Sequence, residues 1–161
     1  MNPKPKSFLA DVMLGRLAKW LRILGYDTLY FRDMDDRELI RRAVRDNRIL
    51  LTRDRELARR DSFRALLIAD EDLESQLAQI LEKYDLEPRI GTGIRCPLCN
   101  QALQDIPRKA VQDIVPRYVW DTHRDFSRCP GCGRVFWKGT HWDRIRERLR
   151  RVGCHLPPGD E

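Results

Sequence analysis

The sequence lacks a glycine-rich phosphate loop and lacks any long apolar run. Glycine occurs nine times in 161 residues, and no glycine-rich turn follows any of the strands predicted below. This counts against a P-loop or dinucleotide-binding domain, whose phosphates need such a loop. The apolar run of the opening segment MNPKPKSFLADVML is too short and interrupted for a signal peptide, and nothing resembles a membrane span. We therefore expect a cytoplasmic protein without a membrane partner.

Charge is abundant and unevenly distributed. Charged residues make up 35% of the chain and hydrophobic residues 42%, which is typical of a folded protein with a heavily charged surface. Residues 1–94 contain 18 Lys and Arg against 17 Asp and Glu, whereas residues 95–161 contain 13 against 8, so most of the net charge of +6 lies in the second part. A basic segment behind a near-neutral one favours a polyanionic partner such as a nucleic acid.

The hydrophobic pattern alternates between short apolar runs and helical stripes. It predicts strands at 7–12, 26–31, 48–52 and 63–69, and helices at 13–24, 33–47, 54–60 and 71–84. Gly25 and Asn47 are expected to end the first two helices. Strands that alternate with helices in this way indicate an α/β fold, with a parallel sheet covered by helices on both faces.

Carboxylates follow every predicted strand. The acids concerned are Asp11, Asp54 and Asp70 after the first, third and fourth strands, and Asp33, Asp35, Asp36 and Glu38 after the second. Ligands of open parallel sheets bind beyond the carboxyl ends of the strands, so these acids are expected at the binding edge. Crowded carboxylates repel one another, and a hard divalent cation such as Mg²⁺ or Mn²⁺ would offset that repulsion.

Three interpretations of Asp54 in the stretch LLTRDRELARR are open at this point: a helix cap, a phosphorylation site or a metal ligand. Asp is a favoured N-cap, and we expect Asp35 and Asp72 to be caps only. Asp11 differs, because it lies in the apolar stretch FLADVML, where a buried carboxylate needs a partner. A phosphoacceptor receiver domain would need an acidic pair at the first strand and a lysine after a later one, and the sequence has neither.

The second part of the chain contains paired cysteines. The motifs CPLC and CPGC supply Cys96, Cys99, Cys129 and Cys132, a set of thiolates that suits a structural Zn²⁺ ion. The long gap between the motifs predicts an excursion with a hairpin around residues 111–120. We expect Cys154 to be a free thiol and residues 144–151 to form a basic helix. The predicted division is a core at 1–90, a zinc-binding module with its closing helix at 91–155, and a tail at 156–161.

Several stretches together resemble a known family. The segments LADVMLGRLAKWLRILGYDT, DDRELIRRA and RILLTRDREL, followed by the two cysteine motifs and VFWKGTHWDRI, resemble the PIN-like RNase domain of the Mut-seven C-terminal type, with its appended zinc ribbon. The resemblance runs from Phe8 to about Leu149. It implies a PIN-like three-layer core and a metal-dependent ribonuclease whose acids bind Mg²⁺ or Mn²⁺. Its products would carry 5′-phosphate and 3′-hydroxyl ends.

The resemblance also assigns individual acids. Asp11 corresponds to the acid of the first strand, and Asp54 to the acid of the T-R-D turn. Asp36 best matches the acid that opens the second helix, with Glu38 as its rival. The fourth acid is the least defined: Asp70 is the candidate, ahead of Asp72. With three acids a single cation could be held, and the number of catalytic ions stays open.

Basic and aromatic residues supply candidate substrate contacts. Arg53 precedes Asp54 directly and Arg16 lies one helical turn beyond Asp11, so both could face substrate and neutralise phosphate oxygens. Lys19 and Arg22 are expected to be plain surface charges. In the stretch FWKGTHWDR, Lys138, His141 and Arg144 are candidates for RNA contact. Phe136 and Trp137, from the same stretch, are expected to pack the ribbon against the core.

Two functions compete on this evidence. The first is a metal-dependent ribonuclease, expected to be an endoribonuclease, that hydrolyses single-stranded or looped RNA by means of a cation-activated water. The second is a non-catalytic RNA-binding protein with a structural zinc ribbon, in which the acids serve only as helix caps. The charge distribution and the cysteines fit both functions. Convergence of Asp11, Asp36 and Asp54 on one metal ion would favour the first.

Overall fold

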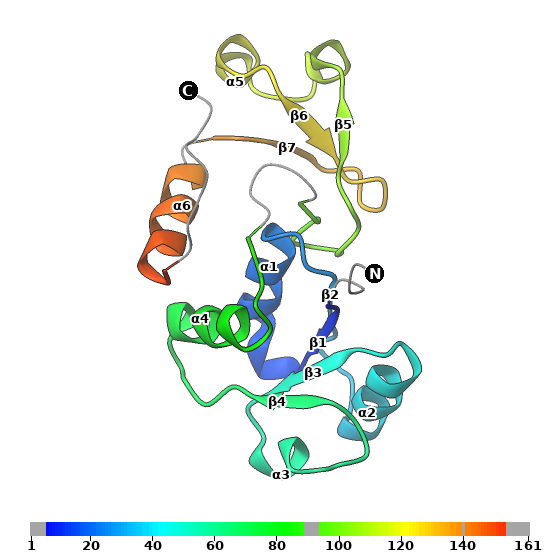
Figure 1. Cartoon of the computed structure of the whole chain (residues 1–161). Helices are drawn as coiled ribbons and strands as arrows, with labels where there is room; N and C mark the ends of the chain where they lie inside the picture. The colour runs from blue at the N-terminus through cyan, green and yellow to red at the C-terminus, as the bar shows by residue number, and fades with distance from the viewer. Residues whose placement is uncertain (1–5, 89–93, 140, 154–161) are drawn as a thin grey trace, which may run out of the picture.

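The computed structural model describes residues 6–88, 94–139 and 141–153, and shows two sheets with different topologies (Figure 1). The first sheet is parallel, with the strand order β2-β1-β3-β4. Its strands and the helices that alternate with them are β1 (Phe8–Ala10), η1 (Val12–Leu14), α1 (Gly15–Ile23), β2 (Thr28–Tyr30), α2 (Asp36–Arg45), β3 (Ile49–Thr52), α3 (Arg55–Ala58), β4 (Ala65–Leu67) and α4 (Leu73–Lys83). The predicted α/β fold with alternating units is confirmed.

Helices cover both faces of the parallel sheet. Alternate residues of β1 point to opposite faces, so Phe8 packs in a cluster with α1 and α4, and Leu9 packs in a second cluster with α2 and α3. Both central strands are completely buried, as their continuous apolar sequence requires. The three-layer arrangement predicted from the sequence is therefore present.

The ends of two helices follow the predicted turn chemistry. Gly25 after α1 has a φ of 90°, and Asn47 after α2 has a φ of 52°. Positive φ angles suit glycine and asparagine, and these residues stop the helices so that the chain can enter the next strand. None of the helices in the described part of the chain has the length and apolar character that a membrane crossing needs.

The second sheet is small and antiparallel, with the order β5-β6-β7. Its elements are β5 (Gln104–Ile106), η2 (Arg108–Val111), α5 (Arg117–Thr122), β6 (Phe126–Arg128) and β7 (Val135–Trp137). We call residues 94–139 the cysteine module. The hairpin predicted at 111–120 is wrong: this segment contains the end of η2 and the start of α5, which follow Pro107 and Pro116. Its buried valines lie four residues apart and form a small core of the module with Phe126.

The last helix, α6 (His141–Arg151), packs on the helices α1 and α4 of the core. Ile145 and Leu149 are buried in the same cluster as α1 and α4. Arg148 forms an ion pair with Glu74 of α4 at 3.2 Å and lies over the ring of Trp20. The chain thus crosses from the core to the cysteine module and returns to the core, and Figure 1 shows α6 beside α4.

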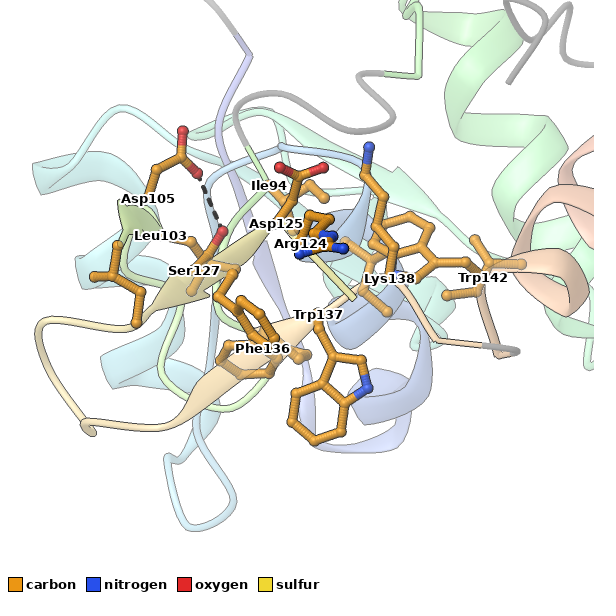
Figure 2. Close-up of a pocket in the computed structure, with 15 residues that line it drawn as sticks. Ile94, Leu103, Asp105, Arg124, Asp125, Ser127, Phe136, Trp137, Lys138 and Trp142 are labelled. Carbon is orange, nitrogen blue, oxygen red and sulfur yellow. Dashed lines mark hydrogen bonds between the residues drawn. The ribbon is translucent and has the colours of Figure 1, made fainter. Parts of the chain in front are cut away.

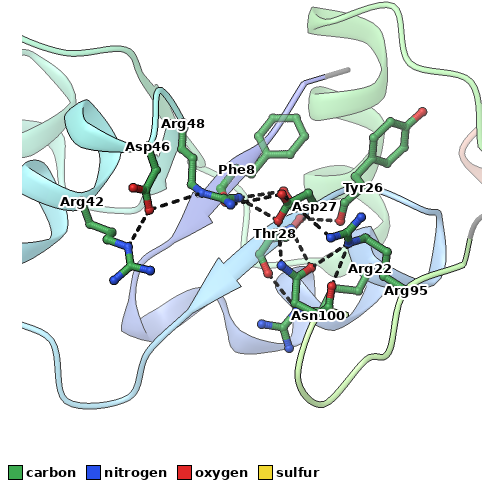
Figure 3. Close-up of polar contacts among 10 residues, drawn as sticks. All are labelled: Phe8, Arg22, Tyr26, Asp27, Thr28, Arg42, Asp46, Arg48, Arg95 and Asn100. Atoms are coloured by element: carbon green, nitrogen blue, oxygen red, sulfur yellow. Dashed lines mark hydrogen bonds and ion pairs between the residues drawn. The ribbon is translucent and has the colours of Figure 1, made fainter. Parts of the chain in front are cut away.

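The cysteine module is joined to the amino edge of the parallel sheet by buried polar contacts, which we call the junction. Asn100, one residue beyond the first cysteine motif, accepts a hydrogen bond from the backbone N–H of Thr28 at 2.9 Å and donates one to Asp27 at 2.7 Å. Asp27 in turn accepts two hydrogen bonds from Arg48, which precedes β3 (Figure 3). Asn100 adopts a φ of 71°, a conformation that asparagine tolerates better than most residues.

Arg22 is also part of the junction. The sequence predicts a surface charge at this position, but Arg22 is buried. It donates through Nε to the carbonyl of Thr28 at 2.8 Å and through Nη1 to the carbonyl of Pro97 at 2.8 Å. Because Pro97 lies inside the CPLC motif, this guanidinium ties the end of α1 directly to the cysteine turn.

Candidate functional site

Four cysteines converge in the cysteine module. The sulfur atoms of Cys96, Cys99, Cys129 and Cys132 all lie within 4.8 Å of one another. The Sγ atoms of Cys96 and Cys132 are 3.7 Å apart, and those of Cys99 and Cys129 are 3.2 Å apart. Four sulfur donors in such a cluster fit a closed tetrahedral Zn²⁺ site. The residues are consistent with structural zinc, as the spacing of the two motifs predicts.

Backbone groups of the second motif favour the thiolate form of Cys129. Burial by itself would raise the pKa of this thiol, but N–H groups from Cys132 and Gly131, together with the thiol of Cys99, lower the pKa to about 7. The N–H of Cys132 lies 3.5 Å from the sulfur of Cys129. Amides aimed at sulfur are expected where a ligand must be deprotonated in order to bind a metal.

Asp11 lies at the carboxyl end of β1, where its side chain is held in one orientation. It is only 6% exposed. One oxygen, Oδ1, accepts from the backbone N–H of Met13 at 3.0 Å. The other, Oδ2, accepts from the hydroxyl of Thr52 at 2.6 Å and from the backbone N–H of Arg53 at 3.1 Å. These partners satisfy the buried carboxylate and fix its direction.

Thr52 connects the first and third strands through its hydroxyl. It donates to Asp11 and accepts from the backbone N–H of Asp54 at 3.0 Å, and it is completely buried. Asp54 is the N-cap of α3: its Oδ1 accepts from the N–H groups of Glu56 at 2.8 Å and Leu57 at 3.1 Å. Thr52 therefore fixes the relative placement of the two acids, and the second oxygen of the exposed Asp54 is not used by the cap.

The other acids follow the carboxyl ends of β2 and β4 in the same sheet. Asp36 is exposed in the first turn of α2, and Glu38 forms an ion pair with Arg41 at 3.0 Å. Asp70 is exposed between β4 and α4. Asp35 and Asp72 are caps, as expected, and accept from the N–H groups of Glu38 and Ser75. We call Asp11, Asp36, Glu38, Asp54 and Asp70 together the acidic edge.

The acids of this edge share a location without forming a closed cluster. In the described residues, the cysteines are the one group of three or more candidate ligands whose atoms all lie within 4.8 Å of one another. Asp11 and Asp54 are linked through Thr52. Asp36 and Asp70 follow β2 and β4, the two outer strands of the sheet, on either side of β1 and β3.

The candidate basic residues fall into two places. Arg16 is exposed on α1, and Arg53 lies beside the acidic edge, 3.7 Å from Glu71 and 3.5 Å from the carbonyl of Ala69. Lys138 and Arg144 are exposed; Lys138 directly follows β7, and Arg144 lies in the first turn of α6. The side chain of His141 and the whole of Cys154 lie outside the described residues.

Sequence reasoning missed apolar side chains beside the acidic edge. Val12 and Met13, which follow Asp11 directly, are 51% and 68% exposed. The hydroxyl of Tyr30 donates to the carbonyl of Val12 at 2.9 Å and holds this turn to β2. Their apolar character suggested burial, and only the structure shows that they form the surface next to the carboxylate.

The architecture defines a class: a parallel β-α sheet with acids at its carboxyl edge, followed by an antiparallel module that carries four cysteines. Residues 6–149 match the family model described as the Mut7-C RNAse domain. The protein therefore belongs to the Mut7-C RNase domain family, as the resemblance predicted. This membership implies a ribonuclease and an RNA substrate. Comparisons with curated proteins and with solved structures gave no match.

Proposed function

We propose that this protein is a metal-dependent endoribonuclease that cleaves single-stranded or looped RNA at the acidic edge. The observation that carries the proposal is the bridge from Asp11 through Thr52 to Asp54, in a chain of an RNase family. A buried carboxylate with a fixed direction next to a partly free exposed one is an arrangement suited to ligand binding. In this proposal residues 1–90 are the catalytic core and residues 91–155 are the zinc-binding module.

The donors of the acidic edge suit Mg²⁺ or Mn²⁺. They are carboxylate oxygens, which hard cations prefer, and Asp11, Asp36 and Asp54 would be the ligands, with Glu38 and Asp70 as further candidates. With a cation held by these carboxylates, the pKa of a bound water molecule would fall and charge on the scissile phosphate would be offset. Arg53 and Arg16 would bind the neighbouring phosphates, because their guanidinium groups lie beside the acids and on the exposed face of α1.

A specific observation favours the alternative, a non-catalytic RNA-binding protein. Asp11 and Asp54 both cap helices, so their geometry has a structural explanation that needs no metal. The two functions differ in what Asp54→Asn does. Asparagine is also a good N-cap, so this variant keeps the helix and removes only the charge.

The test is cleavage of end-labelled RNA by the purified protein after dialysis without strong chelators, so that zinc is retained. Mg²⁺ or Mn²⁺ is then added to wild type, to Asp54→Asn and to the matched cap variant Asp35→Asn. We expect cation-dependent cleavage that falls by at least about 100-fold in Asp54→Asn, because a metal ligand is lost, and persists in Asp35→Asn. Cleavage of a circular RNA would establish endonucleolytic action. RNA binding without cleavage in either metal would favour the alternative.

A further inference from the structure

A cavity of about 540 Å³ lies between the cysteine module and the core, and no residue of the acidic edge lines it. Ile23 at the end of α1 and Ile145 of α6 form part of its wall. Residues of the second sheet and of its connecting segments line it as well, together with Ile94 and Trp142 (Figure 2). Its volume is within the usual range for binding sites of small organic groups, about 300–1,000 Å³. Nothing in the ribonuclease chemistry of the acidic edge uses this space.

Phe136 is the side chain that most clearly indicates a ligand. Its neighbours on β7, Val135 and Trp137, pack on the valine cluster of the cysteine module. Phe136 points to the other face, opposite Ser127 of β6, and lines the cavity half-buried. Its ring packs on none of the three buried clusters in the described part of the chain. The expectation that Phe136 and Trp137 pack the module on the core is corrected: neither ring belongs to the buried cluster of the core, because Trp137 packs on the module's own cluster and both residues line the cavity.

Aromatic rings and charges occur together around this cavity. Trp137 and Trp142 also line it, so rings come from both β7 and α6. The exposed side chains of Arg124 and Lys138 supply two cations. Rings that stack on bases, next to cations that bind phosphates, are the features by which proteins bind unpaired nucleotides.

Hydrogen-bonding groups are also present among the lining residues. The carboxylates of Asp105 and Asp125 lie at the cavity, and Asp105 accepts from the hydroxyl of Ser127 at 3.2 Å. Carboxylates accept hydrogen bonds from the N–H groups at base edges. The two acids balance the two cations locally, so the cavity suits a base with a phosphate attached better than an isolated anion.

We propose that this cavity binds one unpaired base of the RNA, stacked on Phe136, with its phosphate on Lys138 and Arg124. The proposal rests on the proposed function for the identity of the polymer. The base would lie well away from the cleaved bond, because α1 separates the two places: Ile23 lines the cavity, and Gly15 begins the helix beyond Asp11. The nine residues of α1 span about 13 Å. At about 3.4 Å per phosphate of a stacked strand, this distance corresponds to roughly four nucleotides.

The experiment measures binding of a labelled single-stranded RNA by fluorescence anisotropy, without added Mg²⁺ or Mn²⁺ so that no cleavage intervenes. We expect Phe136→Ala to weaken binding about tenfold, since stacking on one ring is typically worth that much, and Phe136→Trp to restore it. Tyr118→Ala removes another aromatic ring of the same module, 69% exposed and outside the cavity, and should leave the affinity unchanged. Zinc content and circular dichroism must match wild type in each variant.

A second arm moves a single abasic nucleotide along the RNA. We expect one position to lose about tenfold in affinity with wild type and to lose nothing further with Phe136→Ala. Equal affinities of Phe136→Ala, Tyr118→Ala and wild type would overturn the proposal. The cavity would then bind a segment of another protein or no ligand. Failure of the ribonuclease hypothesis is distinguishable, because it would show as absent metal-dependent cleavage while this binding assay still reports on the cavity.

Discussion

The four cysteines and the acids of the acidic edge are both sets of potential metal ligands, yet they are held in opposite ways. The sulfur atoms lie within 4.8 Å of one another, brought together by two tight turns of the chain. The carboxylates come from four separate strand ends, and the best placed of them, Asp11 and Asp54, are oriented as helix caps. The cysteines form a closed cluster within one module, whereas the carboxylates are spread along the carboxyl edge of the parallel sheet.

This difference indicates different roles. A closed site with four protein ligands leaves no position for a substrate and is typical of structural metal. An open set of oxygen donors leaves positions for water and phosphate, as catalytic Mg²⁺ and Mn²⁺ sites need. Substitution of a cysteine is therefore expected to lower the stability of the protein, whereas substitution of an acid is expected to lower its catalytic activity.

The largest effect is expected from Cys96→Ser. It removes a buried thiol of the four-cysteine cluster next to the junction, where Pro97 and Asn100 bind Arg22 and Thr28. Structural zinc contributes on the order of 10 kcal/mol in small zinc domains, so we expect loss of zinc and unfolding of the cysteine module. Metal analysis and thermal unfolding measure both. Cys154→Ser, outside the two motifs, is the matched control, and equal zinc content in the two variants would contradict the structural role.

A smaller loss of stability is expected from Thr52→Val. The change keeps the shape of the side chain but leaves the N–H of Asp54 and one oxygen of Asp11 without their buried partner. Such a loss costs about 1–3 kcal/mol, which chemical denaturation would detect. Thr122→Val, at an exposed position on α5, should change stability by less than about 0.5 kcal/mol. If the two variants were equally stable, the hydroxyl bridge between the acids would have no energetic weight.

Asp27 connects stability to pH at the junction. Burial alone would raise its pKa, but hydrogen bonds from Arg48 and Asn100 outweigh burial and hold the pKa below its usual value. The stabilisation by the ionised Asp27 is therefore fully present when the pH is above the pKa of an Asp in the unfolded chain, about 4. It is lost as the pH falls from there through the lower pKa of the folded state. We expect Asp27→Asn to cost on the order of 1 kcal/mol at pH 7, and the difference from wild type to shrink below about pH 4. Asp113→Asn, at an exposed position, is the control for denaturation at both pH values.

The smallest effect is expected from Arg16→Ala. This exposed guanidinium on α1 would bind phosphate without touching the reacting atoms, so KM should rise about two- to fivefold while kcat stays unchanged. The salt dependence of binding should weaken by the contribution of about one phosphate contact. A fall in kcat with constant KM would instead place Arg16 in the reaction itself.

The sequence predicted the repeating parts of the structure better than the contacts between them. Alternating apolar runs predicted the parallel sheet, because strands and helices have a local periodicity. The two C-x-x-C motifs predicted the thiol cluster, because this spacing is typical of zinc ligands. The spacing of Val111, Val115 and Val119 also carried a helical signal, which the hairpin expectation overlooked.

Other features could not be derived from local pattern. Arg22 was expected to be a surface charge, and its burial depends on Pro97, 75 residues away. Asn100 meets Thr28 across 72 residues. Such long-range polar contacts leave no periodic trace, and the same holds for the distances between acids from different strands.

Mn²⁺ binding to the zinc-loaded protein, measured by electron paramagnetic resonance, tests directly whether the acidic edge holds a catalytic cation. Wild type is compared with Asp11→Asn, Asp54→Asn and the cap control Asp35→Asn. We expect a Mn²⁺ site in wild type and in Asp35→Asn that is lost in Asp11→Asn and in Asp54→Asn, because both carboxylates are needed to bind the ion. Mn²⁺ binding that is absent from wild type, or unchanged by Asp11→Asn and Asp54→Asn, would contradict a catalytic cation at the acidic edge.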